Sequence, residues 1–447
     1  MKKERILTKR YFDVFEFGAT GDGKVSDTDA IQQAIDVCHE WGGGIVRLTK
    51  GCFKSGTIEL KSGVFLEISE DAVLLASDKC EDYREFFLDG FINRNFPRGN
   101  GKCLIFSGSS RNAGIFGGGT IDGNGSSFVS RRTDEELKQD YPQWLYKRIG
   151  NQTPPRMLFF LNCGEFFLKK LNIINAPSGW SVFLSHCENV ECENLKIVND
   201  TEYENNDGIH LQGCKNVLIK DCNLKCGDDC IVVRANNNYA IEAKKTENIK
   251  VKNCKLQSSS SAIRIGWVKD GEICRCAFER IFIHDSLKGI SIDIPGLFKK
   301  SVILPGSDIG NEYNDIHDIS FRNIRIERTV TAPISINLTD MPDSKILRLE
   351  NILFSEIKAN GLAFPDLKDK KNGVCRNVVF KDCTFIKEKM TERYPVYAKQ
   401  VKQQKKFLIH TENLTFENTE LVWGDAGRKI DLRKYAEKQI KTQKYNT

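Results

Sequence analysis

The sequence lacks long apolar runs and carries little net charge, and each absence excludes a class of protein. No stretch of the 447 residues approaches the ~20 consecutive apolar residues that a membrane-spanning helix needs, so we expect no membrane partner. The net charge is only +6, from 66 basic and 60 acidic residues. This slight excess is compatible with a polyanionic sugar but is far too small to indicate a nucleic-acid partner.

A secretory signal is also missing from the sequence. The basic N-terminus is followed by no apolar segment and by no small-residue cleavage site. We therefore expect a cytoplasmic protein. The sequence carries no signal for an oligomeric state.

Histidine is scarce, with six residues, whereas cysteine is abundant, with sixteen. Many cysteines recur in one kind of dipeptide, namely Asn162-Cys163, Asp221-Cys222, Asn253-Cys254 and Asp382-Cys383. This recurrence predicts small buried side chains stacked along a core rather than disulfides. The groups Cys222-x3-Cys226-x3-Cys230 and Cys274-x-Cys276 suggest metal ligands, but they lack a zinc spacing and neighbouring histidines. We expect no metal and no cofactor.

Two short segments carry most of the candidate chemistry. Asn205-Asn206-Asp207 and Gly227-Asp228-Asp229 each stand directly before an alternating apolar segment, and Asp207 and Asp228 are 21 positions apart. That separation is about one turn of a repeating β-coil. Neighbouring strands lie ~4.8 Å apart, so stacking would crowd the three carboxyls. At least one of them should then keep its proton near neutral pH, as an acid–base pair requires. The alternative is that these residues only mark turns.

A corner signal repeats along the chain and predicts the architecture. Asn189-Val190, Asn216-Val217 and Asn248-Ile249 each open a strand, at spacings of 27 and 32 positions. The signal returns at Asp318-Ile319, Asn351-Ile352, Asn377-Val378 and Asn413-Leu414. Short β-rich units with a period of ~20–50 residues favour a β-helix. Asparagines stacked at its corners can bond one another's amides and hold the register.

The two ends of the chain differ from this repeat. Apolar residues at positions 30, 31, 34, 35 and 38 form one face of a helix that Ser26 or Asp27 can cap and that Gly42-Gly43-Gly44 ends. We expect residues 11–50 to form a strand and a cap helix over the open apolar end of the solenoid. The charged residues 427–447 are expected to form a short C-terminal cap helix or a frayed tail. A single domain then spans residues 1–447.

Asn-x-Asp followed by Gly-Asp-Asp at this separation resembles glycoside hydrolase family 28, the polygalacturonase family. The resemblance implies an all-β fold, a single-stranded right-handed parallel β-helix that hydrolyses an α-linked pectic oligosaccharide or polysaccharide with inversion. It also implies that Asp228 is the general acid, while Asp207 and Asp229 hold and activate water. Carboxyls on neighbouring coils would span roughly 5–10 Å. This covers both the inverting range of ~6.5–9.5 Å and the retaining range of ~5–5.5 Å, so inversion rests on the resemblance.

The chain departs from the family where the substrate carboxylate is bound. The family carries Gly-His-Gly and then Arg-x-Lys downstream of Gly-Asp-Asp. Ser261 aligns with that histidine, while Ser291 and Asp293 align with the two cations. Asp293 would repel a uronate there. Acid–base catalysis survives this change, whereas ordinary endo-polygalacturonase specificity is not expected. The substrate is then a galacturonide, a rhamnogalacturonan-type fragment or a neutral sugar.

Six further residues are candidates for substrate binding. They are Asn205, His210, Arg234, Arg264, Trp267 and Lys288. The three cations could replace the missing pair or merely neutralise neighbouring aspartates. The histidine could bond a sugar hydroxyl or be structural, and the tryptophan could stack on a sugar ring or pack in the core. A polar excursion over residues 126–155, with Trp144, is expected near the groove or packed on itself.

Two other functions stay open. One is a polysaccharide lyase on the same scaffold, with the three aspartates holding calcium. The other is a non-catalytic carbohydrate-binding β-helix, motivated by the missing histidine and cations. Fold alone does not decide among them.

Overall fold

The computed structural model describes residues 10–92, 101–137, 142–150, 155–237, 239–294, 313–338, 345–369, 374–401, 414–424 and 428–434. Within these ranges β-strands dominate, and α-helix occurs in α1 (Thr28–Glu40), in α2 (Asp134–Leu137) and at residues 432–434. No helix in the described part of the chain is long and apolar enough to cross a membrane. Short 3-10 helices are η1 (Val14–Phe17), η2 (Cys80–Asp82), η5 (Gly125–Phe128) and η7 (Val396–Lys399).

Two long sheets contain nearly all described strands. Sheet A consists of β1 (Tyr11–Asp13), β2 (Asp22–Ser26), β3 (Gly44–Leu48), β4 (Gly51–Ser55), β6 (Val64–Ile68), β7 (Ala72–Ala76), β9 (Arg111–Phe116), β10 (Thr120–Asp122), β14 (Gly164–Ile174), β16 (Glu188–Val198), β18 (Lys215–Lys220), β19 (Asn223–Cys226), β21 (Thr246–Lys252), β22 (Lys255–Ser258), β24 (Gly271–His284), β26 (Tyr313–Thr329), β28 (Lys345–Gly361), β30 (Cys375–Lys381), β31 (Thr384–Lys387), β32 (Leu414–Glu417), β33 (Glu420–Trp423) and β34 (Arg428–Asp431). Sheet B consists of β5 (Ile58–Glu59), β8 (Cys103–Gly108), β13 (Arg156–Leu161), β15 (Val182–Ser185), β17 (Ile209–Gln212), β20 (Ile231–Arg234), β23 (Ser261–Ile265), β25 (Lys288–Ile294), β27 (Ala332–Leu338) and β29 (Asp366–Asp369). A separate antiparallel hairpin joins β11 (Val129–Arg131) and β12 (Tyr146–Arg148).

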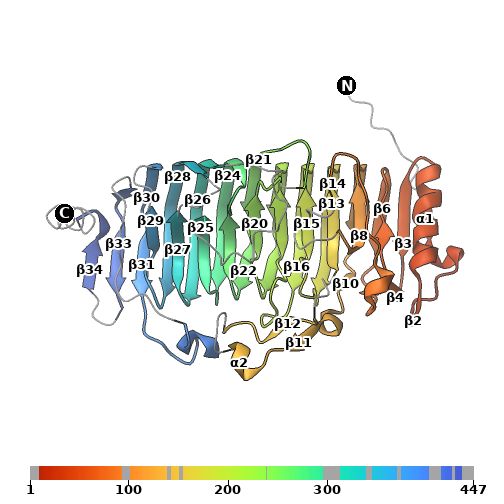
Figure 1. The fold of residues 1–447 in the computed structure, drawn as a ribbon, viewed down its shortest axis with the longest axis horizontal. Coiled ribbons are helices and arrows are strands. Elements are labelled where there is room, and N and C mark those ends of the chain that lie inside the picture. The colour runs from red at the N-terminus through yellow and green to blue at the C-terminus, as the bar shows by residue number, and fades with distance from the viewer. Residues whose placement is uncertain are drawn as a thin grey trace.

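Successive coils stack in register as parallel strands. In sheet B, Ile209 of β17 pairs with Ile231 of β20, which pairs with Ile263 of β23. Sheet A repeats the pattern, for example where β16 lies between β14 and β18. Figure 1 shows the resulting elongated stack, with α1 at one end and β34 at the other. The protein is therefore a parallel β-helix, as the repeated corners predict.

Asparagines form a ladder at the corner where the chain passes from sheet B to sheet A. Asn189, Asn216 and Asn248 have φ values of 55°, 55° and 57°, a left-handed conformation that asparagine tolerates. The Asn216 amide donates to Asn189 Oδ1 (2.9 Å), and the Asn248 amide donates to Asn216 Oδ1 (2.6 Å). The contact recurs from Asn351 to Asp318 and from Asn377 to Asn351. The predicted corner ladder is thus confirmed, whereas its expected member Asn413 lies outside the described residues.

The inside of the coils is filled by aliphatic, cysteine and phenylalanine side chains. All sixteen cysteines are free thiols, and all except Cys52 and Cys80 are buried, which confirms the prediction from the repeated dipeptides. A continuous phenylalanine stack, with neighbouring ring centroids 4.6–5.2 Å apart, consists of Phe278, Phe321, Phe354, Phe380 and Phe416. The sequence analysis missed this stack, because its members align only once the register is known.

Helix α1 contacts β1, β3, β5 and β6 at the N-terminal end of the stack (Figure 1). Its buried residues are Ile31, Ala34, Ile35 and Cys38, the face that the sequence predicts. Of the two predicted capping residues, Ser26 accepts the backbone N–H of Thr28, the first helical residue, at its hydroxyl oxygen (3.5 Å). Asp27 occupies the N-cap position, but its carboxylate accepts backbone N–H groups of Thr20 (2.6 Å) and Gly21 (3.2 Å) instead of one from the helix.

At the C-terminal end of the stack, the first described part of the segment expected as a cap helix or frayed tail is a strand, β34 (Arg428–Asp431), which pairs antiparallel with β33. The next residues, 432–434, are helical. A returning strand satisfies backbone groups that the last parallel strand would otherwise expose. Residues 435–447 of that expected tail lie outside the described residues.

A corner asparagine stabilises the fold through its amide hydrogen bonds and through its tolerance of positive φ, and two replacements of Asn216 separate these contributions. We expect Asn216→Ala to lower the free energy of unfolding by about 1–3 kcal/mol, because alanine loses both amide contacts and is strained at positive φ. Asn216→Gly loses the same hydrogen bonds without the strain, so its loss should be about half as large. Calorimetric Tm values compare the two, and equal losses would contradict a contribution from the backbone conformation.

Candidate active site

The two aspartate motifs meet at the corner where the chain enters sheet B. Asp207 stands just before β17, and Asp228 and Asp229 stand just before β20. The register of these strands makes Asp207 and Asp229 neighbours on adjacent coils, and the Gly208 N–H donates to the Asp229 carbonyl (2.9 Å). The side chains border a cleft of about 660 Å³. This volume lies within the usual range for small-molecule sites.

Two glycines allow this close approach. A Cβ atom on Gly208 would lie 2.4 Å from the Cys230 carbonyl oxygen, and one on Gly227 would lie 2.2 Å from the Tyr203 carbonyl oxygen. No larger residue fits at either position without displacing backbone. The two glycines therefore allow the backbone next to the aspartates to pack closely against neighbouring backbone.

Asp228 is buried and hydrogen-bonded at the corner. It is 8% exposed, and it accepts hydrogen bonds from the Asn205 amide (3.0 Å) and from the Asp229 N–H (3.0 Å). Burial and the neighbouring Asp229 charge raise the pKa of Asp228 to about 6, against the opposing effects of Asn205 and Arg264. This agrees with the expectation that one of the crowded carboxyls retains its proton.

Asp229 is held from the opposite side, by the next coil. The backbone N–H of Ser261 donates to Asp229 Oδ1 (2.8 Å), and the Arg264 guanidinium lies 3.6 Å from Oδ2. The Ser261 hydroxyl contacts the Ser291 hydroxyl (3.0 Å). The position aligned with the family histidine therefore contacts a catalytic candidate through its backbone.

His210 supports Asp207. The imidazole is 3% exposed, stacks on Trp180 with ring centroids 3.8 Å apart, and lies 3.0 Å from Asp207 Oδ2 through Nδ1. Burial and the nearby charges of Arg234, Arg156 and Arg264 lower its pKa well below the usual value. In the neutral ring, Nδ1–H then donates to Asp207, and Nε2 accepts from the Gln212 amide (3.2 Å). These contacts fit a structural role for His210, and the ring also lines the cleft, so binding of a sugar by His210 stays a prediction.

Two of the three predicted cations form close ion pairs inside the cleft. Arg234 contacts both carboxylate oxygens of the fully buried Asp270 at 2.7–3.0 Å. Lys288 lies 2.5 Å from Asp293. Sequence reasoning missed Asp270, because no local motif marks it and only the fold brings it to Arg234. Both of these cations are thus already paired with an aspartate at short distance, whereas the Arg264 contact with Asp229 is longer (3.6 Å).

Tryptophans border the cleft on several sides. Trp267 is partly exposed outside the core, and the Arg264 guanidinium lies 4.2 Å from its ring centroid. The indole N–H of Trp144 donates to the Gly227 carbonyl (2.6 Å), which brings the polar excursion against the catalytic corner. Trp180, which the sequence analysis missed, completes the set. All nine residues predicted for the site line this one cleft.

An aromatic wall, defined as Phe106, Phe159, Trp180, Phe183 and Tyr239, covers sheet B beside the cleft. Phe106, Phe159 and Phe183 occupy the positions on β8, β13 and β15 that are equivalent to His210 on β17. Phe86, Leu88 and Phe91 pack onto this wall from outside. On its N-terminal side the cleft is therefore bounded by His210 and by Trp180 of this wall. Sequence reasoning missed the wall, because apolar residues occur there on both faces of the strands.

The arrangement supports acid–base chemistry. A carboxyl that holds its proton in mildly acidic solution lies beside two further carboxyls in a cleft with aromatic sides. The three carboxylates also offer the oxygen ligands that Ca²⁺ prefers. Asn205, Ser261 and Arg264, however, already direct hydrogen-bond donors or positive charge at these oxygens.

Comparison with known proteins gives consistent matches. The sequence profile of Glycosyl hydrolases family 28 matches residues 67–247, which include both aspartate motifs. The chain is 28% identical over 286 residues to a probable polygalacturonase of Vitis vinifera, covering 62% of this chain and 55% of that protein. It is 22% identical over 434 residues to an exo-poly-alpha-D-galacturonosidase of Dickeya chrysanthemi, covering 83% and 71%. The chain spans about half the length of the first curated relatives that it matches, 55% and 49%.

Solved structures match over most of the chain. A hyperthermoactive exopolygalacturonase from Thermotoga maritima matches with a TM-score of 0.66 at 17% identity, covering 94% of this chain and 93% of that one. A family 28 exopolygalacturonase from Yersinia enterocolitica matches with a TM-score of 0.66 at 19% identity, covering 92% and 76%. At these identities the likeness concerns the fold.

The raised pKa of Asp228 gives a prediction for stability. The native pKa of about 6 lies above the ordinary 3.8, so the native state binds more protons between these values, and stability falls as pH rises through this window. We expect the free energy of unfolding of Asp228→Asn, relative to that of wild type, to rise by on the order of 1–3 kcal/mol when the pH is raised from about 4 to above 6. Unfolding of both proteins at the two pH values measures this gain. A difference independent of pH would contradict the raised pKa.

Proposed function

The chain belongs to glycosyl hydrolases family 28, and we therefore propose that it hydrolyses an α-linked pectic oligosaccharide by acid–base catalysis. The observation that carries this proposal is the meeting of Asp207, Asp228 and Asp229 in one cleft, with the pKa of Asp228 raised to about 6. The names of the curated relatives and solved neighbours, polygalacturonases and exopolygalacturonases, support the same substrate class.

In the proposed mechanism Asp228 donates its proton to the glycosidic oxygen as the leaving sugar departs. Asp207 and Asp229 orient a water molecule and take its proton as it attacks the opposite face of the sugar ring, which inverts the anomeric configuration. His210 fixes Asp207 through the 3.0 Å contact, and Asn205 fixes Asp228. These two are positioning residues.

The cleft charges support a narrower substrate proposal. Arg264 is the cation best placed to meet a uronate carboxylate, because its contact with Asp229 is 3.6 Å long while its guanidinium covers Trp267. Asp293 already neutralises the Lys288 ammonium, so a neutral sugar fits beside this ion pair better than a second uronate does. One acidic and one neutral subsite favour a rhamnogalacturonan-type oligosaccharide over a homogalacturonide.

The aromatic wall supports exo action. Because it covers sheet B up to His210, the described residues leave a long polymer no continuous groove past the three aspartates on that side. We propose that the substrate end lodges against Trp180 and that the chain of sugars leaves toward Lys288 and Asn337.

For the fold, the finer proposal is a single-stranded right-handed coil that forms one domain over residues 1–447. In it α1 shields the apolar N-terminal end. The burial of Ile31 and Ile35 against the first coils supports this role.

The first test is turnover of defined galacturonides and rhamnogalacturonan fragments, read by mass spectrometry. We expect wild type to release sugar from one end with addition of water, and Asp228→Asn to lose at least a thousandfold in kcat, because the leaving group is then unassisted. Asp221→Asn is a matched control at an exposed corner, where asparagine is the usual ladder residue.

Three results of this digest would contradict the proposal. Equal turnover by wild type and Asp228→Asn would remove Asp228 from catalysis. Unsaturated products that vanish with a chelator would instead indicate a lyase, and binding without turnover by wild type across the panel would indicate a carbohydrate-binding protein.

The pH dependence gives an independent prediction. Since Asp228 must be protonated to act as acid and its pKa is about 6, kcat/KM should fall as pH rises above about 6. Asn205 lowers that pKa through its hydrogen bond, so Asn205→Ala should move the alkaline limb to higher pH. If Asn205→Ala lowers the rate but leaves the alkaline limb of the pH profile at the same pH, Asn205 does not lower the pKa of Asp228.

A further inference from the structure

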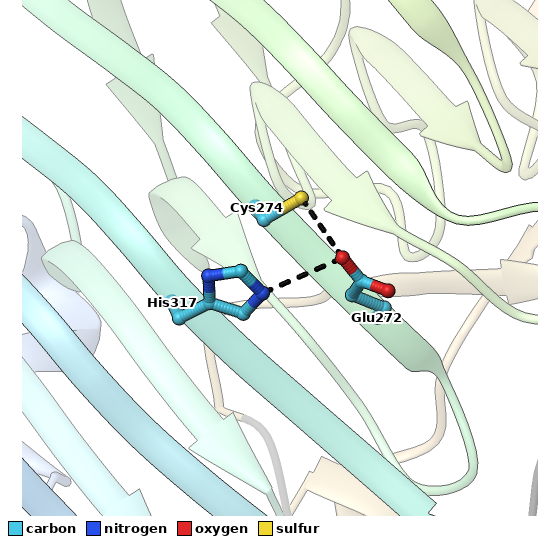
Figure 2. A group of neighbouring side chains, drawn as sticks. All are labelled: Glu272, Cys274 and His317. Atoms are coloured by element: carbon cyan, nitrogen blue, oxygen red, sulfur yellow. Dashed lines mark hydrogen bonds and ion pairs between the residues drawn. The ribbon is translucent and has the colours of Figure 1, made fainter.

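A second cluster of reactive side chains lies in sheet A, separate from the residues of the cleft. Glu272 and Cys274 on β24 and His317 on β26 point toward one another (Figure 2). Cys274 and His317 are directly paired in the register of these strands. Their ligand atoms all lie within 4.8 Å of one another, and only Glu272 is substantially exposed.

The spacing fits tetrahedral metal coordination. With Zn–S of ~2.3 Å and Zn–N and Zn–O of ~2.0–2.2 Å, ligand atoms of a tetrahedral site are about 3.3–3.6 Å apart. The Glu272 Oε1 atom lies 3.2 Å from Cys274 Sγ and 3.4 Å from His317 Nε2. The carboxylate therefore already stands at nearly the right distance from both other donors.

The orientation of His317 is the second observation. Its Nδ1 lies 2.8 Å from the Asp318 carboxylate, so in the neutral ring Nδ1–H donates there and Nε2 carries a lone pair. The residue is 8% exposed, and Nε2 has no hydrogen-bond partner although it faces a carboxylate oxygen. Two acceptors facing each other require a cation or a proton between them. A carboxylate behind the outer nitrogen is the usual support for a metal-binding histidine.

We propose that Glu272, Cys274 and His317 bind a divalent transition metal of borderline softness, such as Zn²⁺, with water as the fourth ligand. Thiolate, imidazole and carboxylate together suit such an ion better than Mg²⁺ or Ca²⁺. On binding, the Cys274 thiol releases its proton to solvent, and the two anionic ligands balance the dication. The ion joins two coils, and Asp318 is its positioning residue.

The site departs from the sequence expectation of no metal. That expectation considered Cys274 only with Cys276, whereas His317 reaches the cluster through the register of β24 and β26. The competing cation is Lys245, whose ammonium lies 3.5 Å from Glu272 Oε1. Its side chain is 39% exposed, and an exposed pair of this kind contributes little, so it yields readily to a dication.

The test is a Co²⁺ titration of the full-length, reduced protein. We expect one equivalent to give thiolate-to-cobalt charge transfer in the near ultraviolet and the intense visible bands of tetrahedral cobalt, and Zn²⁺ to displace them. Cys274→Ser and His317→Gln should each weaken Co²⁺ binding at least a hundredfold. Asp318→Asn should weaken it about 10–100-fold, while keeping an acceptor for the Asn351 amide.

Cys276→Ser is the matched control, because this thiol lies on the same strand but belongs to the core. It should bind Co²⁺ as wild type does. Absence of saturable charge transfer in wild type, or its survival in Cys274→Ser, overturns the proposal. If either ligand variant fails to fold by circular dichroism, the wild-type titration decides: a one-equivalent thiolate band displaced by Zn²⁺ supports the site, and its absence overturns it.

Discussion

In-register stacking of the coils is the constraint on which the rest of the structure depends. Asp207, Asp229 and Ser261 come from three successive coils, and they meet only because Ile209, Ile231 and Ile263 pair directly. Side chains alternate between the two faces of a strand, so a slip of one residue would turn the aspartates of one coil away from the next. The asparagine ladder and the phenylalanine stack both act against such a slip, from the corner and from the core.

The cleft concentrates charge that a protein interior normally avoids. Five aspartates border it or support it, whereas three cations face them, and two of those are committed to the supporting residues Asp270 and Asp293. At the corner that carries Asp207, Asp228 and Asp229, burial and the neighbouring Asp229 charge raise the pKa of Asp228. A carboxyl with a raised pKa lowers stability at neutral pH, and such groups are common at functional sites.

The fold class and the membership of the site could be predicted from the sequence, because both rest on local signals. Corner asparagines recur at the coil period, and Asp207 and Asp228 stand one coil apart before alternating strands. The features that were missed depend on contacts between distant segments. Asp270 reaches Arg234 across a turn, the aromatic wall needs Phe86 and Phe91 to cover it, and His317 reaches Cys274 only through strand pairing. The partners of His210 and Lys288, Asp207 and Asp293, likewise become visible only in the folded chain.

The buried free thiols can report where and when the folded chain opens locally. They are spread along the stack from Cys38 in the first coils to Cys383 near the last, and nearly all are shielded from solvent. In a solenoid each coil contacts mainly its neighbours, so coils can open separately and the ends can fray before the centre. A thiol reagent reaches each sulfur only when its own coil separates. The order in which the cysteines become modified therefore traces how the stack comes apart, one coil at a time, without any introduced label.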